Sequence, residues 1–237
     1  MDQTIRARGT PIEFLCTLIT LAAAGFSGAL LFAIAEAGYS SFQQLAEDVK
    51  IPGIVILILV YFIAKLRNWR WLSGGLWTGF WVGSVSTIGL EAVRIIGFRV
   101  FHSMPGDLPT LMGVLMTGRI MQGPDTVSTF LGYADHFWNG AVFGVVYVLL
   151  FGKRKWWVGT IYGLILGTGF LLSPVVNAIG AGLFGTLVGP KFAVTVYLAH
   201  IVFGSLIGWL VQRSSRSGRS IFGHFSASPR DRHPSST

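Results

Sequence analysis

Two histidines lie in apolar segments that share one glycine spacing. In the segments 135–144 and 199–208, His136 and His200 are each followed by glycine four and eight residues later. Positions i, i+4 and i+8 lie on one side of a helix, so each histidine shares its face with two glycines. Imidazole can ligate a metal or carry a proton near neutral pH, and glycine allows close approach to that face. The pattern therefore predicts a functional site or close helix packing at both positions.

The chemistry of His136 and His200 leaves four interpretations open. Each neutral ring can hydrogen-bond a neighbouring helix, or the two imidazoles can ligate the iron of a b-type haem. A histidine inside a membrane can also handle protons or ions. Metal-dependent catalysis is the fourth, although the His-Glu-x-x-His spacing is absent. Asp135 points about 100° away from His136 around a helix, so the two are not automatic partners. Haem b is the one cofactor among these interpretations, and the sequence leaves open whether any cofactor binds.

Four further polar side chains lie in the apolar segments or at their ends. Glu91 and Arg94 are one helical turn apart and can neutralise each other. Asn139 and Asn177 can hydrogen-bond across helices. The candidate polar site therefore comprises His136, His200, Glu91, Arg94, Asn139 and Asn177. No serine nucleophile elbow, phosphate-binding loop or dinucleotide fingerprint is present, so no catalytic residue is predicted and an enzyme is disfavoured.

The composition is that of a membrane protein. Of the 237 residues, 52% are hydrophobic and 12% are charged, with a mean hydropathy of +0.62, whereas soluble domains carry about 25% charged residues. The net charge of +8 comes from basic residues just beyond the ends of apolar runs. That placement sets membrane topology and excludes nucleic acid as the partner in favour of a lipid bilayer. Cys16 is the only cysteine, which excludes an internal disulfide and a thiolate metal cage.

Six apolar segments predict an all-α polytopic membrane protein with six transmembrane helices. The segments are 14–35, 52–64, 72–96, 127–151, 158–179 and 190–211. Pro52 is expected to open the second helix, and Pro174 to kink the fifth beside Asn177. The stretch near 100–125 is too short and broken to span, so it predicts an interfacial or re-entrant segment. The resulting divisions are a cytoplasmic N-terminus at 1–12, an N-terminal helix pair at 13–71, a four-helix core at 72–211 and a disordered basic tail at 212–237, with an interfacial contact at 221–225.

The distribution of basic residues predicts the orientation. With both termini on one side, that side receives the basic clusters at 65–70 and 153–155 together with the basic ends of the chain. The other side receives only Lys50, Arg94, Arg99, Arg119 and Lys191. Positive charge is retained on the cytoplasmic side of membranes, so both termini are expected to be cytoplasmic.

The last four predicted helices read as a parallel two-helix repeat. Each pair opens with tryptophan and a helix with glycine at every fourth position, and closes with a histidine–glycine helix. The first helices align at an offset of 84 residues (159 − 75) and the second at 64 (200 − 136). Glycines assigned to helix packing are Gly75, Gly79, Gly83, Gly140, Gly144, Gly159, Gly163, Gly167, Gly204 and Gly208. The symmetry predicts that His136 and His200 face the seam between the repeats.

The run 157–167, the segment from His136 to Tyr147 and the closing stretch 199–204 resemble the YagU-like proteins. These form a loose group of small, multi-helix bacterial inner-membrane proteins of uncharacterised function. The resemblance covers about residues 70–211, and the N-terminal helix pair and the long outer connection depart from it. It implies a multi-pass protein of the bacterial inner membrane and supplies no mechanism.

Three functions remain open at this point. The first is a small channel or transporter-like protein with its polar site between the two repeats. The second is a b-haem electron-transfer subunit ligated by His136 and His200. The third is a structural or assembly subunit whose glycine faces bind further copies of the chain or partners in a membrane complex. Parallel repeats, polar residues at mid-membrane depth and a proline-broken helix favour the first.

Overall fold

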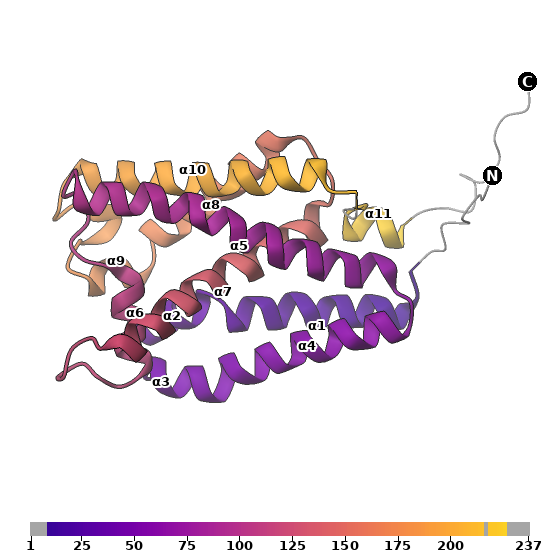
Figure 1. Cartoon of the computed structure of the whole chain (residues 1–237), viewed down its shortest axis with the longest axis horizontal. Coiled ribbons are helices and arrows are strands. Elements are labelled where there is room, and N and C mark those ends of the chain that lie inside the picture. The colour runs from indigo at the N-terminus through magenta and orange to yellow at the C-terminus, as the bar shows by residue number, and fades with distance from the viewer. Residues whose placement is uncertain (1–8, 216–217, 227–237) are drawn as a thin grey trace, which may run out of the picture.

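Long apolar runs form helices that lie side by side in the computed structural model, which describes residues 9–215 and 218–226 (Figure 1). Within those residues every regular element is helical, as expected for a chain that spans lipid. Four of these helices are long and apolar enough to cross a membrane, and a bent pair can supply a fifth span. They are α3–η1–α4 (Phe42–Leu66), α5 (Arg70–Arg99), α7 (Thr126–Phe151), α10 (Pro190–Arg213) and the bent pair α1 (Pro11–Ser27) with α2 (Leu30–Glu36).

Large apolar side chains remain exposed on the outward faces of the helices, most densely on α4 (Ile51–Leu66). Val55, Ile58, Leu59 and Phe62 of this helix are between 48% and 58% exposed. A contiguous apolar face of this kind is costly in water and is compatible with hydrocarbon chains. The pattern indicates contact with a lipid bilayer.

The prediction of six spans is met only in part. Helices α5, α7 and α10 begin and end within three residues of their predicted bounds. The predicted fifth helix, 158–179, is instead two helices, α8 (Trp156–Leu171) and α9 (Pro174–Ala178). With 16 residues α8 is shorter than the roughly 20 that a span requires. Pro174 begins a new helix because it has no N–H for a continuing one, so the expected kink is a break.

The predicted first helix, 14–35, is also broken. Helices α1 and α2 meet at an angle of 43°, with the break at Gly28 and Ala29. Here the N–H of Leu31 donates to Gly28, leaving the carbonyl of Ser27 outside the helical ladder. That carbonyl accepts hydrogen bonds from Lys50 and from Trp138, so neighbouring elements satisfy the group that the break releases.

The second spanning helix starts ten residues before Pro52 (52 − 42), which corrects the prediction that this proline opens it. The chain runs without interruption through α3 (Phe42–Leu45), the π-helix η1 (Ala46–Lys50) and α4. In η1 the N–H of Ile51 donates to the carbonyl of Ala46, five residues back. Proline has no N–H to donate to the helical ladder. The widened turn tolerates this missing hydrogen bond, so the helix continues through Pro52.

The segment near 100–125 contains no helix long enough to span a membrane, as predicted, and its interfacial or re-entrant position stays a prediction. Its one regular element is α6 (Leu108–Met116), nine residues long, which folds back along the first half of α7. Backbones touch there because Gly113 lies against the carbonyl of Ser128. Asp125 caps α7, and hydrogen bonds from the backbone and hydroxyl of Ser128 lower the pKa of the Asp125 carboxyl.

Two helix pairs pack through glycine on both sides. Between α5 and α7, Gly79 faces Gly144, and Gly83 faces Gly140; between α8 and α10, Gly159 faces Gly208, and Gly163 faces Gly204. A Cβ on Gly79, Gly83, Gly144 or Gly204 would overlap backbone atoms of the opposite helix. Such contacts bring helix axes close together and make each pair a tightly packed unit.

The register of these contacts differs by one helical turn from the predicted alignment. Gly79 and Gly159 occupy equivalent positions, which is an offset of 80 residues (159 − 79) in place of 84. Gly75 therefore lies outside the glycine contacts and packs on Leu149, while Gly167 lies against the ring of His200. The predicted alignment matched Gly167 to Gly83. In the packing, Gly167 instead corresponds to Thr87 of the first pair.

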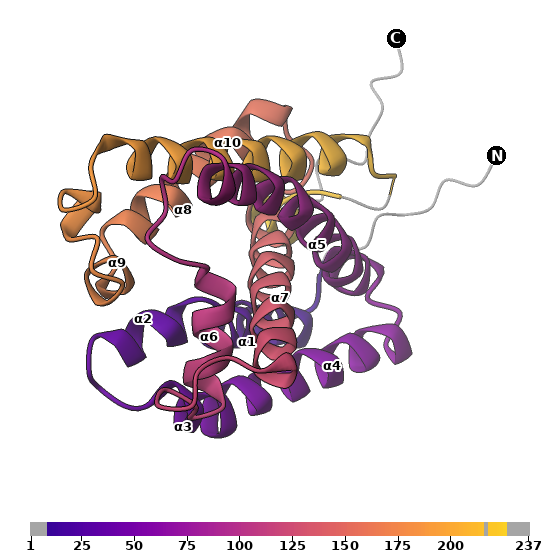
Figure 2. The same cartoon turned by 60° about the vertical axis from the view of Figure 1, so that its left-hand side comes forward.

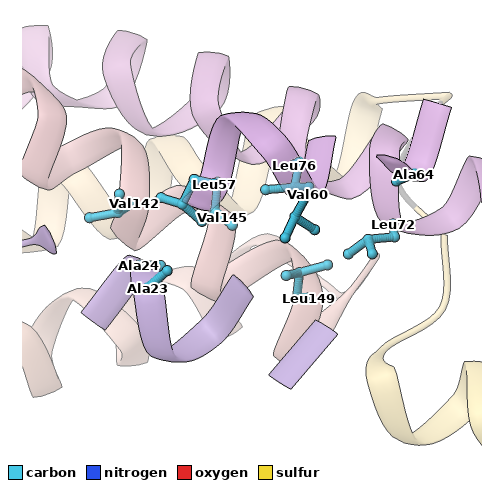
Figure 3. Packing of buried hydrophobic residues seen from close by; sticks show 10 residues of the cluster. All are labelled: Ala23, Ala24, Leu57, Val60, Ala64, Leu72, Leu76, Val142, Val145 and Leu149. Carbon is cyan, nitrogen blue, oxygen red and sulfur yellow. The ribbon is translucent and has the colours of Figure 1, made fainter. Parts of the chain in front are cut away.

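Helix α5 crosses the molecule and joins its two halves (Figures 1 and 2). Near its start it shares a core with α1, α4 and α7, drawn in Figure 3: Ala23, Ala24, Leu57, Val60, Ala64, Leu72, Leu76, Val142, Val145 and Leu149. Near its far end Gly89 lies against the side chains of Leu206 and Val202 on α10. A second core lies between α7, α8 and α10, and the short η2 (Leu183–Gly185) lies in the connection to α10.

The short helix α11 (Ile221–Phe225) closes one end of the bundle, here termed the α11 end. Its His224 stacks on Trp71 of α5 with ring centroids 4.3 Å apart, and Phe225 packs edge-on against Phe14 of α1. Ile221 is buried. The prediction set 221–225 apart from the disordered tail, and in the structure the apolar side chains of this segment pack on α1 and α5. The rest of that tail, 216–217 and 227–237, and the N-terminal residues 1–8 lie outside the described residues.

The glycine contacts predict the outcome of one substitution. Gly204→Leu should prevent assembly of α8 against α10, at a cost above the roughly 1–3 kcal/mol of ordinary overpacking, because the clash is with backbone. Thermal denaturation and yield of the purified protein measure this. Gly169→Leu on α8 is the control, since a Cβ there meets nothing within 4 Å. Wild-type yield and melting for Gly204→Leu would contradict the packing.

Candidate functional site

The predicted pair of Glu91 and Arg94 forms on the last third of α5. The Arg94 guanidinium donates from Nε to Glu91 Oε1 at 2.8 Å and from Nη2 to Oε2 at 2.7 Å, in a two-point contact. Both side chains are buried. Two parallel charge-assisted hydrogen bonds hold the guanidinium in one orientation, so the pair acts as a fixed unit on α5.

This pair extends across two further helices. Arg94 Nη1 lies 2.7 Å from Asp107, the N-cap residue of α6, and the hydroxyl of Tyr133 on α7 lies 3.3 Å from both Asp107 and Arg94. On the other side Glu91 Oε1 lies 2.8 Å from Nε2 of His136. A carboxylate has no proton to donate, so Nε2 carries the proton in this contact. We call these five residues the α5 network; it connects α5, α6 and α7.

A second buried network lies around Asp135, on a neighbouring side of α7. Asp135 forms an ion pair with Lys50 of η1, and both side chains are almost fully buried. Lys50 Nζ also donates to the carbonyl of Ser27 at 2.7 Å, and Trp138 Nε1 donates to the same carbonyl at 3.0 Å. Asn139 Nδ2 donates to Asp135 Oδ2 at 3.2 Å. These five residues, the η1 network, tie the break between α1 and α2 to α7.

A cavity of about 460 Å³ lies between the α5–α7 pair and the α8–α10 pair. His136 lines one wall and His200 the other. Each histidine is ten residues past the start of its helix (136 − 126 and 200 − 190). At about 1.5 Å per residue both histidines are about 15 Å along their helices.

Most of the cavity wall is apolar. Leu30 and Phe32 of α2, Leu90 of α5, Phe143 of α7 and Phe203 of α10 all contribute side chains to it. The volume falls within the roughly 300–1,000 Å³ of small-molecule sites, and an apolar wall with a few placed polar groups is typical of them.

A second, smaller cavity of about 230 Å³ lies towards the end of the bundle opposite α11. It is formed by the loop before α6, by α6 itself and by the end of α8, and Asp107 contributes to its wall. Met104, Leu108 and Phe170 line both cavities. Three apolar side chains therefore separate the central cavity from this outer one.

Four of the six predicted site residues line the central cavity: Arg94, His136, Asn139 and His200. Glu91 does not appear in that wall, and it contacts two residues that do, Arg94 and His136. Asn177 is exposed on α9 and does not line the cavity, because the break before Pro174 turns it outwards. Asp135 and His136 belong to different networks, as their angular separation on α7 predicts.

Several members of both networks are not recognisable from the sequence. Lys50 was assigned only to a membrane surface, and Asp107, Tyr133 and Ser27 were not considered. Lys50 and Asp135 are 85 residues apart (135 − 50), so no local spacing reveals their contact. The available signal was an aspartate inside an apolar segment, which requires a buried positive partner somewhere in the chain.

No family model, curated protein or solved structure matches this chain. The resemblance to YagU-like proteins and the proposed membrane-complex partners or further copies of the chain therefore stay predictions. Among the described residues no group of three or more histidine, cysteine, aspartate or glutamate side chains is placed to hold a metal ion. The two networks and the cavity are therefore the features of this chain that can carry a function.

The η1 network predicts a large and specific loss of stability. Asp135→Leu should cost about 3–5 kcal/mol, because it leaves the Lys50 ammonium buried without its partner. The double variant Lys50→Met/Asp135→Leu should recover most of that loss, since neither charge remains. Equilibrium unfolding in mild detergent measures both.

Arg119→Met serves as the matched control, because Arg119 and Asp125 form an exposed pair worth at most about 1 kcal/mol. Equal destabilisation by Arg119→Met and Asp135→Leu would show that burial of the Lys50–Asp135 pair is not the source of the effect.

Proposed function

We propose that this chain is a transporter-like integral membrane protein whose substrate site is the central cavity. The observation that carries the proposal is the cavity itself, placed at mid-depth between two tightly packed helix pairs, with His136 and His200 on opposite walls. Transporters with repeated halves place their substrate sites near the bilayer midplane at the interface between the halves.

The contacts at this interface differ from those within each pair, which supports movement of one pair against the other. Within the pairs glycine backbones touch; between α5 and α10, Gly89 meets the side chains of Leu206 and Val202, and Gly97 meets the side chain of Thr195. Side-chain interfaces permit small sliding movements of packed helices. In our proposal the α8–α10 pair moves as a unit relative to α5–α7.

In our proposal the pairs α5–α7 and α8–α10 are the two units of the parallel repeat. In Figure 1 α5 and α8 both run from the α11 end to the opposite end, and α7 and α10 return. The corresponding glycine contacts in the two pairs support this symmetry at the 80-residue offset described above. A pseudo-twofold axis along the membrane normal would relate His136 to His200.

For the orientation, we infer that the α11 end faces the cytoplasm of a bacterial cell and that the membrane is the inner membrane. The clusters at 65–70 and 153–155 lie at that end. Of the five basic residues assigned to the other end, Lys50 and Arg94 are buried in ion pairs with carboxylates. Their neutralisation strengthens the charge asymmetry that supports this orientation.

Cysteine accessibility tests the transport proposal. In a Cys16→Ser background, Ala199→Cys places a thiol in the cavity wall. A polar, membrane-impermeant thiol reagent should label it from the outer face and, more slowly, from the cytoplasmic face, because a transporter opens its site to each side in turn. Right-side-out and inverted vesicles provide the two faces.

Leu198→Cys is the control, since the neighbouring Leu198 is 51% exposed on the outside of α10 and does not line the cavity. Surrounding lipid should protect it from the polar reagent. Labelling of Ala199→Cys from one face only, under all conditions, would contradict alternating access.

Haem ligation is retained as a second candidate because of one observation. His136 Nε2 lies 2.8 Å from Glu91 Oε1, and His200 Nδ1 lies 2.8 Å from the carbonyl of Val196. Metal-bound histidines commonly have their other ring nitrogen held in this way, so His136 Nδ1 and His200 Nε2 would face the iron. An absorption spectrum of the protein purified after haem supplementation should then show a Soret band that shifts on reduction. A featureless spectrum contradicts this candidate.

A further inference from the structure

The central cavity contains a buried amide oxygen without a partner. Asn139 is 5% exposed, lines the cavity and donates from Nδ2 to Asp135. Its Oδ1 has no hydrogen-bond partner among the described residues. Turning the amide over would place that oxygen against the Asp135 carboxylate, so the orientation is determined by the η1 network. A buried acceptor left unpaired is costly, and a ligand that donates a hydrogen bond removes that cost.

His200 offers a second acceptor in the same cavity. Its Nδ1 lies 2.8 Å from the carbonyl of Val196, which can only accept, so Nδ1 carries the proton. The ring stacks on Phe170 and contacts no carboxylate in the described part of the chain. A neutral imidazole that donates from Nδ1 has its lone pair on Nε2. Nε2 is therefore a further atom in this wall that can accept from a ligand.

The donor groups of the wall lie against acceptors of the protein, and those of Arg94 and His136 are within 2.8 Å of carboxylate oxygens. Three lining hydroxyls, on Thr87, Thr195 and Ser173, donate to backbone carbonyls of their own segments. The guanidinium of Arg94 contacts two carboxylates, Glu91 and Asp107. An anionic ligand would therefore meet no unpaired positive charge, and it would lie close to the carboxylates of both networks.

The cavity also reaches the lipid-facing surface. Leu30 of α2 and Ile165 of α8 both line it, yet they are 48% and 62% exposed. Gly169, one turn beyond Ile165, lines it as well and has open space where a Cβ would lie. Figure 2 shows α2 and α8 on the same side of the molecule. We call the gap bounded by Leu30, Ile165 and Gly169 the lateral opening.

We propose that the central cavity binds a neutral, hydroxyl-bearing amphiphile of the long-chain alcohol class, which enters from the bilayer through the lateral opening. Its hydroxyl donates to Asn139 Oδ1 or His200 Nε2, and its apolar chain occupies the space along α2 and α8. This inference rests on the cavity as the substrate site and names the class of ligand that the site takes. The cavity therefore combines free acceptors, paired cations and an apolar wall open to lipid, and this combination selects the class.

A matched set of photoreactive probes tests the ligand class on the wild-type protein. Three diazirine-bearing alkyl chains of equal length would carry a hydroxyl, a methyl ether or a carboxylate. In lipid nanodiscs the alcohol should crosslink to cavity residues of α7 and α10 about tenfold more strongly than the ether, which cannot donate. Mass spectrometry of the labelled peptides provides the readout. Equal labelling by the ether, or stronger labelling by the carboxylate, overturns the proposal.

Variants locate the hydrogen bond and the entrance. Asn139→Leu and His200→Phe together should reduce alcohol labelling to the level of the ether. Ile165→Trp should slow labelling by filling the lateral opening, whereas Ile161→Trp, one turn away on the same lipid-facing side and absent from the wall, should not. Identical rates for the two tryptophan variants would exclude entry between α2 and α8. If the Asn139 variant does not fold, the probe series on wild-type protein still decides the ligand class.

These experiments separate the ligand from the transport proposal. Selective alcohol labelling combined with thiol access from one face only would retain the binding site and reject transport. Access of Ala199→Cys from both faces without headgroup selectivity would retain transport and reject this ligand class.

Discussion

The structure depends on pairing the charges that the fold buries at membrane depth. Helix α7 carries neighbouring Asp135 and His136, and each faces a partner of opposite character on a different element, Lys50 of η1 and Glu91 of α5. A buried charge without a partner costs several kcal/mol, so α7 cannot rotate without losing both contacts. The two networks thereby set the orientation of α7 in the bundle, and with it the direction in which His136 and Asn139 face.

Tight and loose interfaces alternate across the bundle, and the cavity lies in the loose one. Glycine backbones meet within α5–α7 and within α8–α10, whereas larger side chains separate the two pairs. Because α2 and α8 are both shorter than a full span, neither covers the interface along its whole length. The same arrangement explains why the cavity lies between the two pairs.

Helix irregularities gather around that cavity. The break after Ser27 and the π-helix before Pro52 lie on elements that build the η1 network. The break before Pro174 lies beside residues of the cavity wall. In lipid an interrupted helix is stable only when the protein satisfies the released backbone groups, as Lys50 and Trp138 do for the Ser27 carbonyl. Such interruptions are common where membrane proteins bind substrates, because they bring polar atoms to a depth that regular helices leave apolar.

The sequence by itself determined the all-helical membrane class, the bounds of α5, α7 and α10, and the matching positions of His136 and His200 along their helices. Those properties depend on local hydropathy and helical period, which are readable along the chain. Only the tertiary structure decided that Lys50 pairs with Asp135, that Asn177 faces outwards and that the glycine register is shifted by one turn. These depend on how each helix is rotated and where it breaks, and that is set by packing between segments far apart in sequence.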